Sequence, residues 1–224
     1  MPAELDSRTR ADLERLLEVL ATDPTAPSSV TEPAAAWKVH VADSLSGLEL
    51  AELARAETVA DIGSGAGFPG LVVAVAKPAA KVDLIESTRR KCEFMRRAIG
   101  AAAIDNARVV CERAEAWAAE EGREAYEAVT ARAVGRLSTI AELASPLLRE
   151  GGALIVWKGR RDPAEEAELE RAADRLAMRH EDVRWVGPFA GSRHRHLHLL
   201  RKSGPSPTGL PRRPGMAKKR PLGS

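Results

Sequence analysis

The first part of the chain carries apolar residues at helical spacing. Four leucines recur at the i, i+3, i+4 and i+7 positions of one helix face: Leu13, Leu16, Leu17 and Leu20. This spacing predicts an amphipathic helix over about residues 6–21. Prolines and serines then predict a loop, and Thr31 followed by Pro33 predicts the start of a second helix, which carries Trp37, His40, Val41 and Leu45. We expect residues 1–57 to form an N-terminal helical cap.

From residue 58 onward, short apolar runs alternate with helical stretches. Strands are predicted near 58–62, 81–86, 107–112, 126–131 and 153–158. Helices are predicted near 69–77, 88–99, 114–121, 137–149 and 163–178. This alternation is typical of a parallel sheet that is covered on both faces. Two final apolar runs, 183–186 and 197–201, have no helix between them, which predicts an antiparallel hairpin.

Together these elements predict an α/β fold: a doubly wound, seven-stranded sheet that ends in an antiparallel hairpin and carries the helical cap. We place the main domain at residues 58–202. Residues 203–224 are rich in Pro, Gly, Ser and basic residues, so we expect them to form a flexible C-terminal tail.

Charge separates the C-terminal part of the chain from the rest. Residues 189–224 contain nine Lys and Arg but no Asp or Glu, and the whole chain has 34 basic and 32 acidic residues. Residues 1–188 therefore hold 25 basic and 32 acidic residues, a net charge of −7. A basic segment on an acidic body indicates a polyanionic partner, because fixed cations displace counterions from phosphates. A solvated tail without a partner is the alternative.

Composition excludes other classes of protein. No run approaches the roughly 20 apolar residues of a membrane span, and residues 1–4 do not begin a signal peptide, so we expect a cytoplasmic protein. Cys92 and Cys111 lie in neither a CxxC pair nor a Cys/His cluster, so we expect no disulfide framework and no metal. Three alternating histidines lack acidic or thiol neighbours, and we favour RNA or solvent contact for them over metal binding: His194, His196 and His198.

The most informative motif is GSGAGFPG at residues 63–70, directly after the first predicted strand. Glycines permit positive φ angles and let a ligand approach the backbone, and Pro69 is suited to open a helix whose amide end favours negative charge. Gly65, Gly67 and Gly70 also fit the GxGxxG pattern of dinucleotide sites, which by itself is weak evidence. The loop therefore predicts a nucleotide-like cofactor.

Neighbouring residues favour a cofactor other than a dinucleotide. Pro69 lacks an amide donor where a pyrophosphate needs one, and Asp61 places a carboxylate before the first glycine. We expect this carboxylate to repel a diphosphate and attract an ammonium or a sulfonium; capping of the loop amides is the alternative. Glu86 ends the second predicted strand, where a carboxylate can accept from both ribose hydroxyls of either cofactor.

Several motifs resemble those of the RsmG family, also called GidB. They are HVADSL at 40–45, DIGSGAGFPG at 61–70, LIES at 84–87, RAE at 113–115, TARAV at 130–134, WKG at 157–159, RHLHLLRK at 195–202 and LPRRPGMAKKRPL at 210–222. The resemblance implies a class I, Rossmann-like methyltransferase that transfers methyl from S-adenosylmethionine to N7 of a guanine in 16S ribosomal RNA. The family's Asn-Leu-Thr loop element is missing, and residues 24–31 take its place, so no contact of that loop is carried over.

The resemblance also implies a set of cofactor-binding residues. Gly63, Gly65 and Phe68 would line the methionine and ribose side of the cofactor, and Glu86 would bind the ribose. Ala114 and Glu115 would flank the adenine. Arg132 would contact the cofactor carboxylate or the RNA. All follow the carboxyl ends of predicted strands, where doubly wound sheets bind ligands. Each of three residues has an alternative role. Phe68 fits simple core packing, Glu115 fits an exposed acid at a helix start, and Arg132 fits a solvated side chain.

Contacts to RNA are expected from cations near the ends of the last strands. The candidates are Lys158, Arg193, Arg195, Arg212 and Arg213. Lys158 fits a solvated lysine at a strand end equally well. His40 and Asp43, three residues apart on a predicted helix, fit a pair near the cofactor mouth and a helix-surface pair equally well.

The implied chemistry needs no catalytic acid, base or nucleophile, because guanine N7 presents a free lone pair. The implied partner is 16S ribosomal RNA or a small-subunit assembly intermediate, on which we expect a monomer to act. Two other functions remain open: a small-molecule methyltransferase of the same fold, and an RNA-binding module without enzymatic activity.

Overall fold

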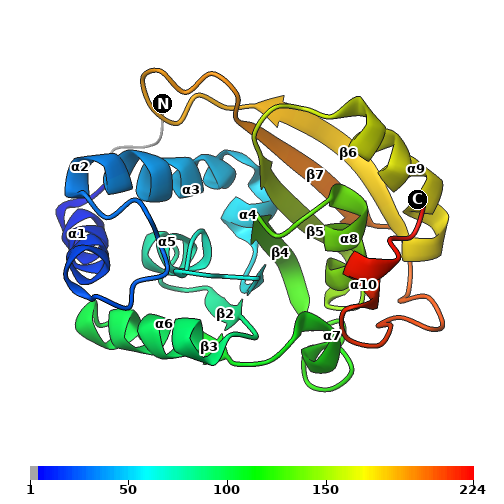
Figure 1. Cartoon of the computed structure of the whole chain (residues 1–224), viewed down its shortest axis with the longest axis horizontal. Coiled ribbons are helices and arrows are strands. Elements are labelled where there is room, and N and C mark those ends of the chain that lie inside the picture. The colour runs from blue at the N-terminus through cyan, green and yellow to red at the C-terminus, as the bar shows by residue number, and fades with distance from the viewer. Residues whose placement is uncertain (1–4) are drawn as a thin grey trace.

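A seven-stranded sheet forms the centre of the computed structural model, which describes residues 5–224 (Figure 1). The strands are β1 (Thr58–Ile62), β2 (Lys81–Ile85), β3 (Ala107–Val110), β4 (Tyr126–Arg132), β5 (Leu148–Lys158), β6 (Met178–Trp185) and β7 (His196–Lys202). Their order is β3-β2-β1-β4-β5-β7-β6. The pairs among β1 to β5 are parallel, whereas β7 lies antiparallel between β5 and β6. The predicted doubly wound sheet with a terminal antiparallel hairpin is therefore confirmed.

The strand order reverses at β1, with β2 and β3 on one side and β4 and β5 on the other. Ligands of open α/β sheets bind outside the carboxyl ends of the strands at such a switch point. The glycine loop follows β1 and leads into α5 (Gly70–Ala76), and Glu86 follows β2. The topology therefore brings the predicted cofactor residues to the same edge of the sheet.

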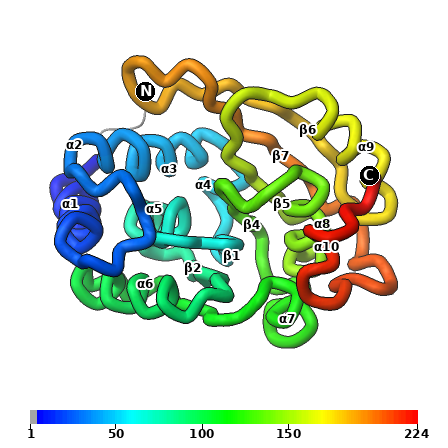
Figure 2. The backbone as a smooth tube through the Cα atoms, viewed as in Figure 1, coloured from blue at the N-terminus to red at the C-terminus, as the bar shows by residue number. Residues whose placement is uncertain are grey.

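The sheet separates two apolar cores, because successive side chains of a strand point to opposite faces. Val59 and Ile155 belong to the core that also contains residues of α1 (Ser7–Thr22), α5 and α6 (Arg89–Ala101). Ala60 and Leu154, one position away on the same strands, belong to the core formed with α7 (Ala114–Trp117), α8 (Leu137–Ala144) and α9 (Pro163–Leu176). Figure 2 shows the backbone of both helical layers around the sheet.

The N-terminal part consists of α1 and a series of short helical turns. Asp6 caps α1 by accepting from the amides of Arg8 and Thr9, and the four leucines of the predicted apolar face are buried. The second predicted helix is divided into α2 (Pro33–Ala36), the π-helical η1 (Trp37–Ala42) and α3 (Asp43–Leu45). The 3₁₀-helical η2 (Ser46–Glu49) and α4 (Ala51–Arg55) follow it. Single π-helical turns often occur at functional sites, and this one ends next to Asp43. Residues 1–4 of the predicted cap lie outside the described residues.

Several predicted boundaries were wrong. The helices predicted at 114–121 and 137–149 are the shorter α7 and α8, and β5 begins at Leu148, before the glycine pair at 151–152. β6 begins at Met178, well before the predicted 183, because Ala177 adopts a left-handed φ of 48° that ends α9 immediately before it. Within residues 5–224, no helix combines the length and the apolar character that crossing a membrane requires.

Residues 203–224 pack against the second core, beside α8 (Figure 1). Leu210 and Leu222 are buried there, and the short α10 (Met216–Lys219) contributes the buried Ala217. Lys202, at the end of β7, is buried and donates to the hydroxyls of Ser145 (3.2 Å) and Ser206 (2.9 Å). Burial lowers the pKa of Lys202 to about 8. The expectation of a flexible tail missed this packing, because the basic composition conceals three widely spaced apolar residues. The division of the chain at residues 57 and 202 stays a prediction.

Candidate active site

The glycine loop exposes its backbone beside a buried carboxylate. Gly63, Gly65 and Gly67 have φ angles of 65°, 61° and 92°, a region that favours glycine. The Gly65 amide donates to one carboxylate oxygen of Glu86 (3.2 Å), and the Thr88 amide donates to the other (2.8 Å). A Cβ added to Gly65 would meet no atom closer than 3.8 Å. This open backbone next to Glu86 fits the ribose portion of a nucleoside cofactor.

The surroundings of Asp61 favour the capping alternative over direct contact with an ammonium or sulfonium group of the cofactor. The side chain is buried, and its carboxylate accepts from the Thr130 hydroxyl (2.8 Å) and the Gly70 amide (3.2 Å). Burial raises the pKa of Asp61 to about 6. Asp61 therefore caps the start of α5 and connects β1 to β4. These contacts match the capping alternative, and the enclosed carboxylate presents no exposed surface to a ligand.

The predicted adenine side of the site includes a contact to the C-terminal segment. Ala114 and Glu115 are both buried at the start of α7. The Glu115 carboxylate accepts from the Gly215 amide (2.7 Å), where Gly215 has a φ of 84°. The exposed-helix-start alternative for Glu115 was therefore wrong, and this side chain holds residues 203–224 beside the predicted adenine position.

A cavity of about 420 Å³ lies at the carboxyl ends of β4 and β5. At its wall, Arg132 donates to Asp43 Oδ2 (2.9 Å) and to the Val39 carbonyl (3.0 Å). The Arg132 guanidinium also lies 3.3 Å from His40 Nδ1, and the His40 ring stacks on Phe68 of the glycine loop with centroids 4.6 Å apart. Burial, followed by the charge of Arg132, lowers the pKa of His40. The cavity wall is thus continuous with the glycine loop.

These contacts decide between several alternatives left open by the sequence. His40 and Asp43 are buried and share the partner Arg132, so they do not form a helix-surface pair. Arg132 is mostly buried in the same cluster and is not simply solvated. Trp157 also lines the cavity and donates its indole N–H to the Asp43 carbonyl (2.8 Å). Sequence reasoning missed Trp157, although the WKG motif directly after a strand was the available signal.

The five predicted RNA-contacting cations lie in different surroundings. Lys158 and Arg195 line the cavity: the Lys158 ammonium donates to Glu165 (2.7 Å), and Arg195 Nε lies 3.3 Å from Asp43 Oδ1. Arg193 and Arg213 are exposed. Arg212 differs, because it forms a bidentate ion pair with the buried Glu142 and donates to the Arg220 carbonyl. This ion pair argues against the predicted RNA contact of Arg212.

The C-terminal histidines also differ from one another. His196 contacts the Gly159 carbonyl (2.7 Å), but His198 is buried and stacks on His180 with centroids 5.2 Å apart. Burial, followed by the neighbouring His180, lowers the pKa of His198 to about 4. The expected RNA or solvent contact was therefore wrong for His198. In the part of the chain that the structure describes, no group of three or more His, Cys, Asp or Glu residues could hold a metal ion.

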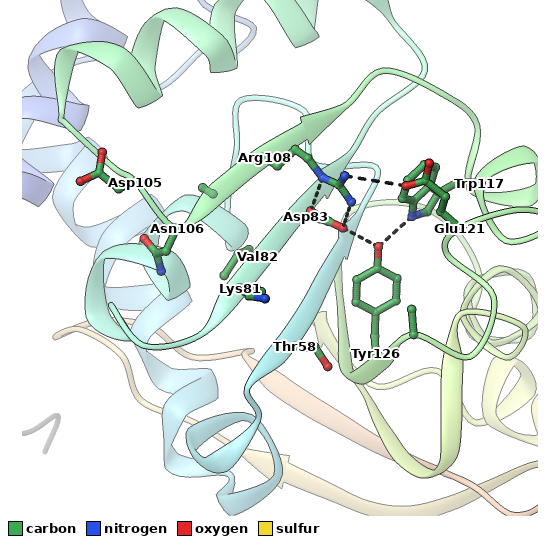
Figure 3. A pocket seen from close by; sticks show the side chains of 12 residues that line it. Thr58, Lys81, Val82, Asp83, Asp105, Asn106, Arg108, Trp117, Glu121 and Tyr126 are labelled. Atoms are coloured by element: carbon green, nitrogen blue, oxygen red, sulfur yellow. Dashed lines mark hydrogen bonds and ion pairs between the residues drawn. The ribbon is translucent and has the colours of Figure 1, made fainter.

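A second cavity, of about 500 Å³, lies at the opposite, amino ends of β1 to β4 (Figure 3). There Arg108 donates to both carboxylate oxygens of Asp83 (2.9 and 2.8 Å) and lies over the Trp117 ring. The Tyr126 hydroxyl donates to Asp83 (2.7 Å) and accepts from the Trp117 indole (2.7 Å). These polar groups satisfy one another, so the network connects β2, β3 and β4 and does not resemble a second reaction centre.

The sheet order, the glycine loop after β1 and the acid after β2 define the class of S-adenosylmethionine-dependent methyltransferases. Solved structures share this fold. A SAM-dependent methyltransferase from Aquifex aeolicus is 16% identical and gives a TM-score of 0.56 over 76% of this chain and 93% of that chain. The fibrillarin pre-rRNA processing protein of Methanococcus jannaschii, also 16% identical, gives a TM-score of 0.55 over 73% of this chain and 74% of that chain.

Residues 11–197 match the family described as GidB, rRNA small subunit methyltransferase G. Curated relatives named ribosomal RNA small subunit methyltransferase G include one from Pelotomaculum thermopropionicum, 38% identical over 188 residues, which are 82% of this chain and 77% of the relative. Another, from Thermotoga neapolitana, is 41% identical over 162 residues, which are 72% of this chain and 70% of the relative. The chain therefore belongs to the GidB family of methyltransferases, as the motif resemblance predicted.

Proposed function

We propose that this protein transfers a methyl group from S-adenosylmethionine to N7 of a guanine in 16S ribosomal RNA. The observation that carries the proposal is the family match over residues 11–197, because this range includes the glycine loop, Glu86 and the cavity beside Arg132. The choice of guanine N7 rests on the motif resemblance. The proposed substrate is the free RNA or a small-subunit assembly intermediate, and the protein acts on it as a cytoplasmic monomer.

The proposed cofactor site lies around the glycine loop. Gly63, Gly65 and Phe68 would line the methionine and ribose portions, and Glu86 would accept from the ribose hydroxyls. The open backbone at Gly65 and the carboxylate 3.2 Å from its amide support this assignment. Ala114 and Glu115 would flank the adenine. Because Glu115 already accepts from the Gly215 amide, its second carboxylate oxygen is the one assigned to the adenine amino group.

Arg132 is assigned to the junction between cofactor and RNA. Its side chain donates to Asp43 on one side and lies 5.9 Å from the Phe68 ring on the other. The glycine loop and the cavity therefore share a wall formed by Arg132, His40 and Phe68. A cofactor held by the loop and a base held in the cavity would meet at this wall.

The proposed reaction depends on positioning. S-adenosylmethionine supplies an activated methyl group on a cationic sulfur. Guanine N7 carries a lone pair and no proton at neutral pH, so no residue has to remove a proton before attack. Holding two reactants in line can contribute roughly 7–11 kcal/mol to lowering the barrier. We accordingly assign no general acid, general base or nucleophile among the residues of the cavity.

The proposed RNA surface includes the cavity wall and the C-terminal segment. Lys158 and Arg195 line the cavity, and the exposed Arg193 lies two residues before Arg195. Arg213 belongs to the C-terminal segment that Glu115 holds, together with the exposed Lys218, Lys219 and Arg220. Cations spaced in this way would contact phosphates and position the RNA without reading its sequence.

Methylation of unmodified RNA tests the proposal. The purified protein is incubated with radiolabelled S-adenosylmethionine and small-subunit RNA from a strain that lacks this gene, as free 16S RNA and as assembly intermediates. We expect label in a single N7-methylguanine, located by chain cleavage after borohydride and aniline treatment. RNA from the parent strain is the control and should accept no label. Equal cleavage of the RNA from both strains before incubation with the protein would refute the assignment.

A further inference from the structure

One carboxylate oxygen in the cavity lacks a hydrogen bond. Asp43 is 4% exposed, and its Oδ2 accepts from Arg132, whereas the buried Oδ1 has no hydrogen-bond partner. Arg195 Nε lies 3.3 Å from Oδ1, but it is also without a hydrogen bond because the two groups are poorly aligned. A buried carboxylate oxygen that is left unsatisfied is costly. Asp43 therefore carries an unsatisfied acceptor at the wall of a cavity of about 420 Å³.

We propose that Asp43 is the residue that selects guanine, by accepting hydrogen bonds from N1–H and the 2-amino group of the target base. This inference rests on the proposed function. Guanine is the RNA base whose Watson–Crick edge places two donors side by side. Adenine presents the N1 lone pair at the same place, and cytosine presents N3, so a carboxylate would repel both edges. Uracil offers one N–H between two carbonyl oxygens.

This assignment also explains why the modified atom is N7. N1 and the 2-amino group lie on the edge of the purine opposite the imidazole ring, so a base held through them keeps N7 free of protein hydrogen bonds. A fixed carboxylate at one edge sets the orientation of the ring in the cavity. The Arg132 contact fixes that carboxylate, and the indole of Trp157 holds the Asp43 backbone from the other side. Asp43 thus positions the base and takes no proton from it.

Arg195 is the group that the base replaces. Its side chain is 38% exposed, and it lies immediately before β7, two residues after the exposed Arg193. Its Nε lies 3.3 Å from Oδ1, but it does not form an aligned hydrogen bond. Donors of the base would satisfy Oδ1 with better geometry, and Arg195 would then be free to contact a phosphate of the same RNA.

The test compares guanosine with inosine at the methylated position. Inosine lacks the 2-amino group but retains N7, so a synthetic RNA that the wild-type protein methylates is prepared with either nucleoside. A hydrogen bond to a charged group corresponds to about 10- to 100-fold in kcat/KM, and we expect the wild type to prefer guanosine by this factor. In Asp43→Ala the preference should fall to within about threefold, and in Asp43→Asn, which retains a neutral acceptor, to an intermediate value.

The control variant is Asp83→Asn, which removes a carboxylate that also binds an arginine but lies at the opposite end of the sheet. It should keep the wild-type preference for guanosine. If both Asp43 variants lose activity on the two RNAs by the same factor, Asp43 only supports Arg132 and the assignment is overturned. If the wild type methylates neither RNA, the proposed function itself fails and this assignment with it. If the preference for guanosine is lost in the Asp43 variants and kept in Asp83→Asn, the assignment is supported.

Discussion

Replacing Asp61 with asparagine should remove a large pH dependence of stability. The pKa of the buried carboxyl is about 6 in the folded protein, against 3.8 for an exposed aspartate. Between these values the folded protein retains a proton that the unfolded chain has lost, so the free energy of unfolding falls as the pH rises through this window. A separation of about two pKa units corresponds to about 3 kcal/mol in total. Asparagine can accept from the Gly70 amide without becoming charged.

The measurement is urea unfolding of the wild type and Asp61→Asn at pH 4.5 and pH 7.5. Between these values, the free energy of unfolding of the wild type should fall relative to that of the variant by about 2 kcal/mol. Asp105→Asn, which removes an exposed carboxylate, is the matched control and should change stability by less than about 0.5 kcal/mol at either pH. A difference between wild type and Asp61→Asn that is the same at both pH values would show that Asp61 titrates as in the unfolded chain.

Three further predictions concern the site. Glu86→Ala should weaken S-adenosylmethionine binding by at least tenfold in calorimetry and leave RNA affinity within about twofold, because one buried carboxylate supplies the proposed ribose contacts; a larger loss of RNA affinity contradicts this. Gly65→Ala should lower the free energy of unfolding by only about 1–2 kcal/mol, since its φ of 61° is unfavourable for alanine but the added Cβ has space. Gly67→Ala should lower the free energy of unfolding by more, because its Cβ would lie 2.3 Å from Leu71. Equal melting temperatures of the two variants would contradict this prediction. Arg212→Ala should destabilise the protein by about 3 kcal/mol, because it leaves Glu142 buried and unpaired. The neighbouring Arg213→Gln should leave stability unchanged and should reduce the slope of log K for RNA binding against log salt concentration by about one. The reverse pattern would refute the separation of their roles.

The periodicity of apolar residues was sufficient to predict the sheet and its hairpin. The strands around β1 are short apolar runs bounded by glycine and charged residues, and such runs are recognised without knowledge of their neighbours. Boundaries that depend on tertiary contacts were not predictable in the same way. The start of β6 at Met178 depends on the left-handed Ala177, and nothing in the identity of an alanine indicates that conformation.

The candidate site was predictable where a motif carries the chemistry, as at the glycine loop and Glu86. It was not predictable where partners come from distant segments. Asp61 accepts from Thr130, which is 69 residues away, so a local reading assigned its charge to a ligand. Arg212 and Glu142 are 70 residues apart, so the ion pair between them could not be predicted from the basic C-terminal segment alone. The charge of a residue is read from the sequence, but its partner is not.

The proposed site would include residues from the helical layers on both faces of the sheet. His40 and Asp43 belong to the N-terminal layer, whereas Glu115 and Gly215 belong to the layer on the other face. Two layers with separate cores can open independently, and amide hydrogen exchange measures each opening. A ligand that contacts both layers binds only when both are closed. Binding of such a ligand would therefore slow amide hydrogen exchange on the two faces together.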